Sequence, residues 1–187
     1  MTGPAAEPGT VRLLTAAEAG ERVAELSAVL IDCVEGGASV SFMAPLTRER
    51  ADAFWRRVAD GVAAGDRLLV AAEDRAGGEI VGTVQVVFAA PENQPHRADV
   101  AKMLVHRSAR RRGLGAGLLR AAEEAALAAG RTLLVLDTVT GSEAERLYQR
   151  MGWIRVGVVP DYALWPDGRP CDTTFFYRRL SRGIPAP

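Results

Sequence analysis

The sequence predicts an α/β domain built on a mixed sheet. Strand-like and helix-like segments alternate along the chain and do not separate into blocks. The longer segments repeat their apolar residues at helical spacing, whereas Leu133–Leu136 is a wholly apolar run typical of a strand buried on both faces. No repeat or linker divides the 187 residues, so we expect one domain over 11–181, with loose termini at 1–10 and 182–187.

The first third of the chain is expected to hold a short strand and two helices. Val11–Leu14 is the strand, and the capping-box pattern Thr15-Ala-Ala-Glu18 opens a helix that stops near the glycines at 36–37. A second helix opens at Thr47 and carries Trp55 in its apolar stripe, so we expect this tryptophan in the core.

Strands dominate the remainder of the prediction. Two of them form a hairpin around a turn at residues 74–78, and a later strand leads into a long helix that begins near Leu114. Ser142–Met151 is a short helix, and Pro160–Pro170 is a long loop rich in turn-forming residues. The expected strands are Arg67–Glu73, Ile80–Ala89, Ala98–Val105, Leu133–Leu136, Trp153–Val159 and Thr173–Arg179.

The other segments are organised around the stretch from Asp99 to Ala126. There a strand leads into a helix through Gly113, Gly115 and Gly117, which leaves backbone N–H groups unpaired and lets a ligand approach the backbone closely. Arginines at 110–112 add positive charge beside these glycines. Because unpaired N–H groups, the helix dipole and the arginines all favour an anion, the stretch predicts a diphosphate-binding loop.

Other interpretations of this stretch fit less well. A nucleoside triphosphate loop would end in Gly-Lys-Ser or Gly-Lys-Thr, and neither is present. The dinucleotide fingerprint is a closer competitor, because Gly113-Leu114-Gly115 follows a strand and Asp137 closes the next one. However, Leu118 stands where the third glycine of that fingerprint belongs. A basic surface loop before an ordinary helix is the simplest alternative.

The order Arg110-x-x-Gly113-x-Gly115 resembles the acetyl-CoA signature of the GNAT superfamily of N-acetyltransferases, (Arg/Gln)-x-x-Gly-x-(Gly/Ala). The predicted order of elements is similar to the GNAT fold over residues 11–180. This resemblance implies a mixed, mostly antiparallel sheet that splays at its centre, with helices on both faces and acetyl-CoA in the gap. The residues expected to bind acetyl-CoA are Met103, Leu104, Val105, Arg110, Arg111, Arg112, Gly113, Leu114, Gly115 and Ala116.

A second motif points to the same family. The segment Ala144-Glu-Arg-Leu147-Tyr148-Gln-Arg-Met-Gly152-Trp153 is similar to the A-x-x-L-Y-x-x-x-G-F segment of GNAT proteins. One departure is Gly141, which stands where many members have an asparagine that touches the pantetheine arm. Further segments resemble the tabtoxin resistance protein subgroup, whose members acetylate a small amine-bearing toxin. These segments are Gly36–Met43, Leu136–Thr138, Pro160–Tyr162 and Pro166–Gly168.

Transfer of an acetyl group to an amine requires the neutral amine. Because a typical alkylammonium group has a pKa of about 10, a base is expected near the acceptor. Many GNAT enzymes place an acidic base where Asp99 stands, and Asp137 faces the same cleft in the family. We rank Asp99 slightly ahead as the base, with Asp137 orienting the acceptor or a water molecule. The alternative for both is an ordinary solvated aspartate at a strand end or loop.

The departing CoA thiolate is expelled more easily when a proton donor stands nearby. Tyr148 matches the family's tyrosine in that role, although its helical neighbours would also suit a tyrosine of the core. The irregular segments 36–43 and 160–170 flank the expected cleft, and loops of this kind commonly carry binding residues. We therefore expect Gly37, Ser39 and Trp165 to contact the acceptor.

Composition limits the partners. The 23 basic and 23 acidic residues balance, so we expect neither a nucleic-acid partner nor a membrane partner. No apolar stretch is long enough to span a membrane, and the first ten residues lack the pattern of a secretion signal. The cysteines and histidines fit no metal-ligand spacing, and two isolated cysteines suggest a reducing compartment. We therefore expect a cytoplasmic protein without a metal.

These observations predict an acetyl-CoA-dependent N-acetyltransferase. It would transfer an acetyl group to the amine of a small molecule, such as a toxin or an antibiotic, by direct attack in a ternary complex. The alternatives are a protein N-terminal or lysine acetyltransferase, a non-catalytic acetyl-CoA-binding regulator and a nicotinamide oxidoreductase. The expected partners are acetyl-CoA and the small-molecule amine, and a homodimer is left open.

Overall fold

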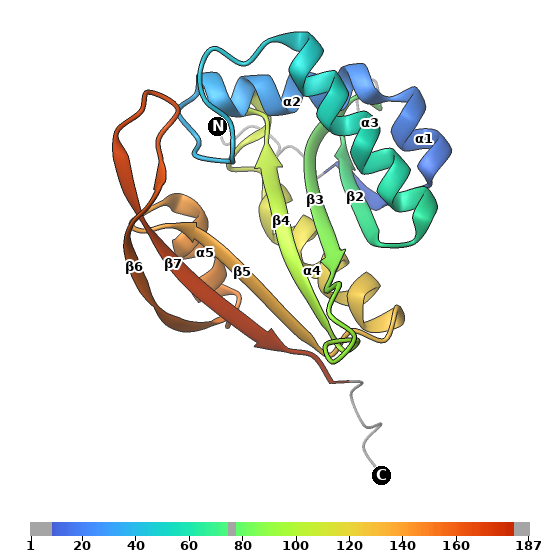
Figure 1. Ribbon diagram of the computed structural model, residues 1–187. Coiled ribbons are helices and arrows are strands. Elements are labelled where there is room, and N and C mark those ends of the chain that lie inside the picture. Colours follow the sequence, from blue (N-terminus) through green and yellow to red (C-terminus); the bar gives the residue numbers. More distant parts are fainter. Residues whose placement is uncertain (1–8, 75–77, 182–187) are drawn as a thin grey trace, which may run out of the picture.

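The computed structural model describes residues 9–74 and 78–181. Within these residues, seven strands form one sheet in the order β1-β2-β3-β4-β5-β7-β6 (Figure 1). Neighbouring strands are antiparallel except for β4 and β5, which are parallel, so the sheet is mixed and mostly antiparallel as predicted. The strands are β1 (Thr10–Leu14), β2 (Arg67–Glu73), β3 (Ile80–Phe88), β4 (Arg97–Val105), β5 (Leu133–Val139), β6 (Ile154–Leu164) and β7 (Pro170–Arg179).

Helices cover both faces of this sheet, which confirms the predicted layering. Three helices pack over one face of β2, β3 and the end of β4, and two lie on the opposite face (Figure 1). The first group is α1 (Ala16–Glu21), α2 (Val23–Glu35) and α3 (Arg48–Ala64), and the second is α4 (Leu114–Ala128) and α5 (Glu143–Arg150).

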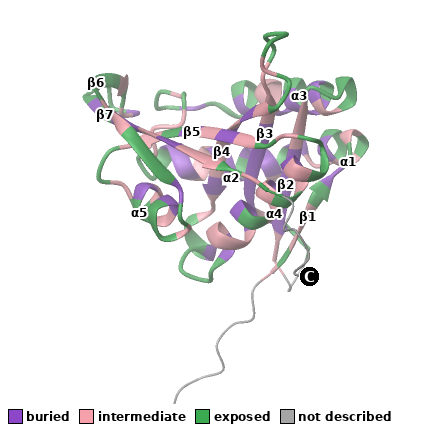
Figure 2. Cartoon of the chain, turned by 90° about the horizontal axis from the view of Figure 1, so that it is seen from below, coloured by how far each residue is buried: buried purple, intermediate pink, exposed green. Residues whose placement is uncertain are grey.

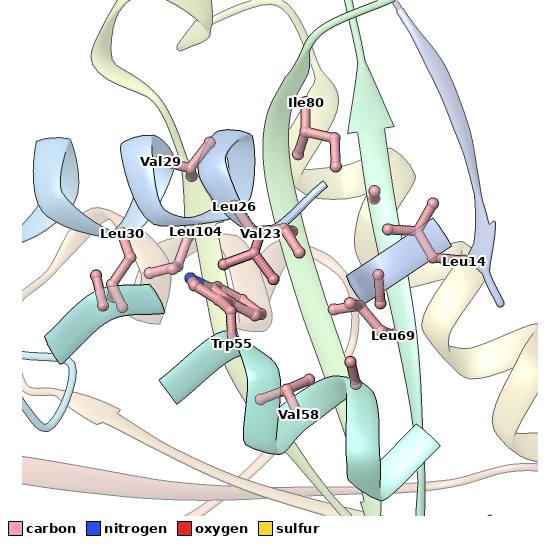
Figure 3. Packing of buried hydrophobic residues seen from close by; sticks show 14 of the residues in the cluster. Leu14, Val23, Leu26, Val29, Leu30, Trp55, Val58, Leu69, Ile80 and Leu104 are labelled. Atoms are coloured by element: carbon pink, nitrogen blue, oxygen red, sulfur yellow. The ribbon is translucent and has the colours of Figure 1, made fainter. Parts of the chain in front are cut away.

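Each helical layer encloses its own apolar cluster. On the α1–α3 face, Trp55 is fully buried and packs among Leu30 and Val58 (Figure 3), which confirms its predicted place in the core. On the other face, Leu118 of α4 and Phe176 of β7 belong to a second cluster. Figure 2 shows the buried residues gathered between these layers, whereas the β6 edge is largely exposed.

The predicted first helix is divided in two. The capping box is present as predicted: the Glu18 backbone N–H donates to the Thr15 hydroxyl, and the Thr15 N–H donates to the Glu18 carboxylate. However, α1 ends at Glu21, because Arg22 (φ −103°, ψ 20°) leaves the helical conformation before α2 begins. At this break the Arg22 guanidinium forms ion pairs with Glu25 and Glu73.

The β6–β7 region differs most from the prediction. Pro160–Pro170 is not a long loop, because β6 continues to Leu164 and β7 already begins at Pro170. The register between the two strands shifts between Val159 and Ala163, and Asp161 has a φ of +51°. Pro160 is tolerated at this bulge in an edge strand, because the N–H that proline lacks is not needed there for a hydrogen bond between strands. The true turn is therefore only residues 165–169.

Burial of β5 also differs from the prediction. Leu134 and Leu136 are buried against the α4–α5 layer, but Leu133 and Val135 are only half-buried. The α1–α3 layer covers β2 and β3 rather than β5, so the second face of β5 has no helix over it (Figure 1). The apolar run predicted the strand correctly but not burial on both of its faces.

The described sheet runs without a break from β1 to β6, and the single domain over 11–181 stays a prediction. Thr10 already belongs to β1, so the first strand begins one residue earlier than expected. The rest of the predicted loose termini, 1–8 and 182–187, lies outside the described residues, as do residues 75–77 of the predicted hairpin turn. None of the described helices is long and apolar enough to cross a membrane.

Candidate active site

A cleft opens where the two parallel strands separate. β4 and β5 are paired only from Arg97 to Asp99 and from Leu133 to Val135. Beyond that point β5 stays paired with β7, while β4 continues along β3 to Val105 (Figure 1). A cavity of about 1150 Å³ fills the region of this separation, and its walls include the second half of β4 and residues 137–139 of β5. The sheet therefore splays at its centre.

The N-terminus of α4 forms one end of the cleft. Gly113 is the N-cap of α4 with a left-handed φ of +78°, and no side chain caps the helix. A Cβ built on Gly113 would meet no protein atom within 4 Å, so the space beside it is open. The uncapped N–H groups of Leu114, Gly115 and Ala116 line the cleft with Gly113. This arrangement suits an anion, because the helix dipole and the orphan donors both favour negative charge.

The arginines of this loop divide into two groups. Arg110 and Arg111 line the cleft, and Arg111 holds a left-handed φ of +63°. Arg112 does not belong to the cleft wall, and its guanidinium donates to the Ser108 carbonyl oxygen at 2.9 Å. The structure therefore brings two of the three predicted arginines to the cleft.

Asp32, near the end of α2, binds the residues that precede this loop. Its carboxylate accepts hydrogen bonds from the backbone N–H and the Nε of Arg107, both at 2.8 Å, and lies 3.4 Å from Nε2 of His106. Burial acts to raise the pKa of this carboxyl, but the two hydrogen bonds and the nearby positive charges outweigh burial and lower it. Asp32 is therefore charged at neutral pH and fixes the residues that lead into Arg110.

The last residues of β4 line the gap as predicted. Met103, Leu104 and Val105 all belong to the cleft wall. Their side chains are taken up by packing: Leu104 joins the α1–α3 cluster, while Met103 and Val105 pack against the other one. What these residues offer to a ligand in the gap is therefore mainly their backbone.

The two candidate base residues lie in different surroundings. Asp137 lines the cleft, whereas Asp99 does not. Asp99 lies at the closed end of the gap beside Val135, and its carboxylate is 2.6 Å from the Arg97 guanidinium. Burial of its carboxyl raises the pKa of Asp137, and the positive charge of Lys102 opposes this rise in part. The residue as a whole is nevertheless exposed. The geometry favours Asp137, the reverse of the sequence ranking.

Tyr148 belongs both to the core and to the wall of the cleft. Its ring is buried, with a centroid 5.8 Å from that of Trp153 and 6.0 Å from that of Phe176, yet the residue also lines the cleft. Burial, followed by the negative charge of Asp137, raises the pKa of the hydroxyl. The phenol therefore keeps its proton at neutral pH and is available as a proton donor.

A third part of the cleft is walled by the loop after α2 and by the turn between β6 and β7. Gly37, Ser39 and Trp165 line it, so the structure brings all three predicted acceptor contacts to one place. Two hydrogen bonds join the two segments: the Ser39 hydroxyl donates to the Leu164 carbonyl at 2.7 Å, and the Ala44 N–H donates to the Pro166 carbonyl at 3.0 Å.

Three further basic residues line the cleft that the sequence reasoning did not select. Arg146 and Arg150 lie one turn apart on α5, and their spacing within the second motif was a usable signal for a basic face. Lys102 lies in the middle of β4, where only a local bulge directs its side chain into the cleft, so no comparable signal precedes it in the sequence. Gly141 does not belong to the wall; its N–H donates to the Glu145 carboxylate.

No group of three or more His, Cys, Asp or Glu residues within 9–74 and 78–181 has the geometry to hold a metal ion. The cysteines Cys33 and Cys171 are both buried and unpaired.

Comparison with protein families gives one match. The model of the acetyltransferase (GNAT) domain matches residues 64–155, from the last residue of α3 to the start of β6. This segment contains the splayed strands, the α4 N-terminus and Tyr148.

Several solved structures share the fold across nearly the whole chain. An N-acetyltransferase from Staphylococcus aureus Mu50 is 18% identical, with a TM-score of 0.76 and coverage of 92% of this chain and 99% of that chain. A GNAT superfamily phosphinothricin acetyltransferase from Sinorhizobium meliloti, in complex with acetyl-CoA, is 18% identical, with a TM-score of 0.76 and coverage of 96% and 92%. A ribosomal-protein-alanine N-acetyltransferase from Brucella melitensis is 22% identical, with a TM-score of 0.74 and coverage of 91% and 99%.

Proposed function

We propose that this chain, whose residues 64–155 match the acetyltransferase (GNAT) domain, uses acetyl-CoA to acetylate the amine of a small molecule. One observation carries the proposal: an uncapped helix N-terminus and the pair Asp137 and Tyr148 line a single cleft. The first suits a diphosphate, and the second suits proton transfer at an amine and a thiol.

The donor end of the cleft fits the diphosphate of acetyl-CoA. Gly113 leaves open the space that a Cβ would fill, and the first N–H groups of α4 lie beside it with Arg110 and Arg111. The backbone of Met103–Val105 would hold the pantetheine arm in the gap left by β5. Acetyl-CoA supplies the thioester whose acetyl group is transferred.

At the acceptor end, we assign Asp137 as the base that takes a proton from the incoming ammonium group, directly or through a water molecule. Its raised pKa makes it a better proton acceptor than an ordinary aspartate. The neutral amine would then attack the thioester directly, because one cleft is lined by both the donor and the acceptor residues.

Tyr148 is the corresponding acid. Its hydroxyl holds its proton at neutral pH because burial and the Asp137 charge both disfavour the phenolate. The departing thiolate would take this proton as the carbon–sulfur bond breaks, which makes the thiol a better leaving group. A non-catalytic acetyl-CoA-binding regulator would have no use for this pair of groups.

The walls of the acceptor part support a small acceptor rather than a protein chain. The hydrogen bonds from Ser39 and Ala44 to the β6–β7 turn join the two segments that would have to separate to admit an extended chain. The Sinorhizobium meliloti neighbour is a phosphinothricin acetyltransferase, and several segments resemble the tabtoxin resistance subgroup. We therefore propose an amine-bearing toxin or antibiotic as the acceptor class.

We also propose a homodimer in the cytoplasm. Support for a second copy comes from the edge strand β6, where Ile154, Val156 and Val159 are 51%, 66% and 42% exposed. Exposed apolar residues on an edge strand are a common basis for pairing between chains. Two unpaired cysteine thiols suit a reducing compartment. Light scattering across a concentration series tests the dimer.

A screen of small amines and N-terminal peptides for release of CoA thiol tests the proposed reaction. We expect at least one small amine to cause release of CoA thiol that the variant Tyr148→Phe does not show in single turnover. Peptides should cause less release than this amine. Release with peptides but with no small amine would overturn the proposed acceptor class. Calorimetry should show binding of acetyl-CoA and none of a nicotinamide dinucleotide.

A further inference from the structure

Lys102 is the only lysine in the sequence. The other 22 of the 23 basic residues are arginines. The two side chains are not equivalent: the guanidinium group stays charged in proteins, whereas a buried lysine amine can lose its proton and act as a nucleophile. The single lysine also lines the proposed acetyl-transfer cleft.

A bulge in β4 places this lysine. Ala101 is opposite Gln85 and Leu104 is opposite Thr83, so β4 carries one residue more than β3 at this point. Lys102 takes up the extra length with a left-handed φ of +50°, and the Thr83 hydroxyl donates to its carbonyl at 3.1 Å. Bulges change the direction of a side chain, and here the lysine lies in the cleft.

The amine of Lys102 has a hydrogen-bond partner but no close counter-ion. Nζ donates to the Ser41 hydroxyl at 3.0 Å and lies 5.8 Å from the centre of the Phe54 ring. Within 9–74 and 78–181, no carboxylate approaches it to ion-pair distance, although the charge of Asp137 is close enough to oppose the effect of burial. Burial still lowers the pKa of the amine, so a larger share of it is neutral than for a lysine in water.

We propose that Lys102 is an internal acetyl acceptor, and that the protein acetylates its own Nζ when no other amine occupies the cleft. This inference rests on the proposed function, because it uses the same donor and the same acid and base. The cleft would thus contain an amine of the chemical class that it acts on, beside the base that serves that reaction.

The step balances with the groups already assigned. Nζ reacts as the neutral amine: its lone pair forms a bond to the acetyl carbonyl carbon, and one Nζ–H proton passes to Asp137 as that bond forms. The carbon–sulfur bond of the thioester breaks, and the CoA thiolate takes the proton of Tyr148. The proton on Asp137 then returns to the Tyr148 phenolate, so both groups are restored. The products are N-acetyl-lysine at position 102 and CoA thiol, with no oxidant, reductant or further reactant.

Acetylation would change the site in two ways. The modified side chain is longer and neutral, so it would occupy part of the acceptor space and lose the positive charge that lowers the pKa of Asp137. Because the longer side chain takes up acceptor space, a protein acetylated at Lys102 should turn over an external amine more slowly. The supply of acceptor would then decide how much of the enzyme is modified.

Anion binding is the competing role for a cation in this cleft. An arginine would serve that role at least as well, because its planar fork binds carboxylates with two hydrogen bonds. The variant Lys102→Arg separates the two roles, since it keeps the positive charge but removes the amine that can be acetylated.

The test is intact-mass spectrometry of the full chain incubated with acetyl-CoA alone, followed by peptide mapping. The matched control is Arg120→Lys, which adds a lysine on the exposed face of α4, outside the cleft wall. We expect one acetyl group at Lys102, added at least about tenfold faster than at the introduced lysine, because a positioned base accelerates only the first reaction. Asp137→Asn should slow labelling of Lys102 without affecting the control lysine.

Two outcomes overturn the inference. Either Lys102 carries no acetyl group, or it is labelled no faster than the lysine of Arg120→Lys, which would indicate uncatalysed acetylation. If an external amine is acetylated while Lys102 stays unmodified, this inference fails and the proposed function stands. If Lys102 is labelled but no small amine releases CoA thiol, the proposed acceptor class fails and the internal acceptor stands.

Discussion

Asp137 and Tyr148 line the same cleft from β5 and α5, and the charge of the Asp137 carboxylate adds to burial in raising the pKa of the Tyr148 hydroxyl. Burial raises the pKa of both groups, with different consequences for their chemistry. It makes the aspartate a stronger proton acceptor and makes the tyrosine hold its proton more firmly. The aspartate is thereby suited to remove a proton, and the tyrosine stays protonated at neutral pH, which a proton donor requires.

Tyr148→Phe separates chemistry from packing by one atom. Phenylalanine keeps the ring contacts with Trp153 and Phe176, so we expect little change in the melting temperature and in the affinity for acetyl-CoA. If the hydroxyl protonates the thiolate, the single-turnover rate should fall about a hundredfold. Single turnovers are the right measurement, because slow product release can hide a loss in kcat. An unchanged rate would leave Tyr148 as a residue of the core alone.

Gly113→Ala should abolish tight binding of acetyl-CoA, and Gly130→Ala provides a matched control. Both glycines have a φ of +78° and no neighbouring atom within 4 Å of the position that a Cβ would take, but only Gly113 lines the cleft. Each alanine should therefore destabilise the fold by a similar amount, about 1–2 kcal/mol, because of the left-handed conformation. Calorimetric titration with acetyl-CoA should show weaker binding only for the Gly113 variant. Equal affinities for the two variants would place the diphosphate elsewhere.

Ser39→Ala removes the hydrogen bond that joins the loop after α2 to the Leu164 carbonyl. One such bond contributes about 1 kcal/mol, so the KM for the acceptor should rise about fivefold, with little change in the KM for acetyl-CoA. Ser181→Ala, at an exposed serine outside the cleft, is the control and should change neither constant. A rise in the KM for acetyl-CoA alone would show that this wall belongs to the donor end.

Local signals explain which elements could be predicted from the sequence. The capping box at Thr15, the glycines before α4 and the apolar run at Leu133–Leu136 each act through backbone geometry or burial within a few residues, and each marks a real element. The split at Arg22 and the continuation of β6 past Pro160 depend on ion pairs and strand pairing with distant residues, so a local pattern could not reveal them.

The same distinction applies to the site. The donor loop follows from glycine spacing, and Tyr148 follows from its motif, so both could be selected from the sequence. Lys102 enters the cleft only because β4 bulges against Thr83 and Gln85, and a bulge leaves no clear trace in the pattern of apolar residues. The sequence ranks Asp99 over Asp137, whereas only Asp137 lines the cleft, because the point at which β4 and β5 separate is fixed by pairing across the sheet.

The pH dependence of acetyl transfer in Asp137→Asn and Asp99→Asn tests the central claim most directly. In the parent protein, kcat/KM should fall on acidification through a pKa above that of ordinary aspartate, because burial raises the pKa of Asp137 and the protonated carboxyl cannot accept a proton. Asp137→Asn should lose most activity near pH 7 and recover at about pH 9.5, where more of the amine is already neutral. Asp99→Asn should keep the parent profile. A loss in Asp137→Asn by the same factor at both pH values would contradict the assignment of Asp137 as the base.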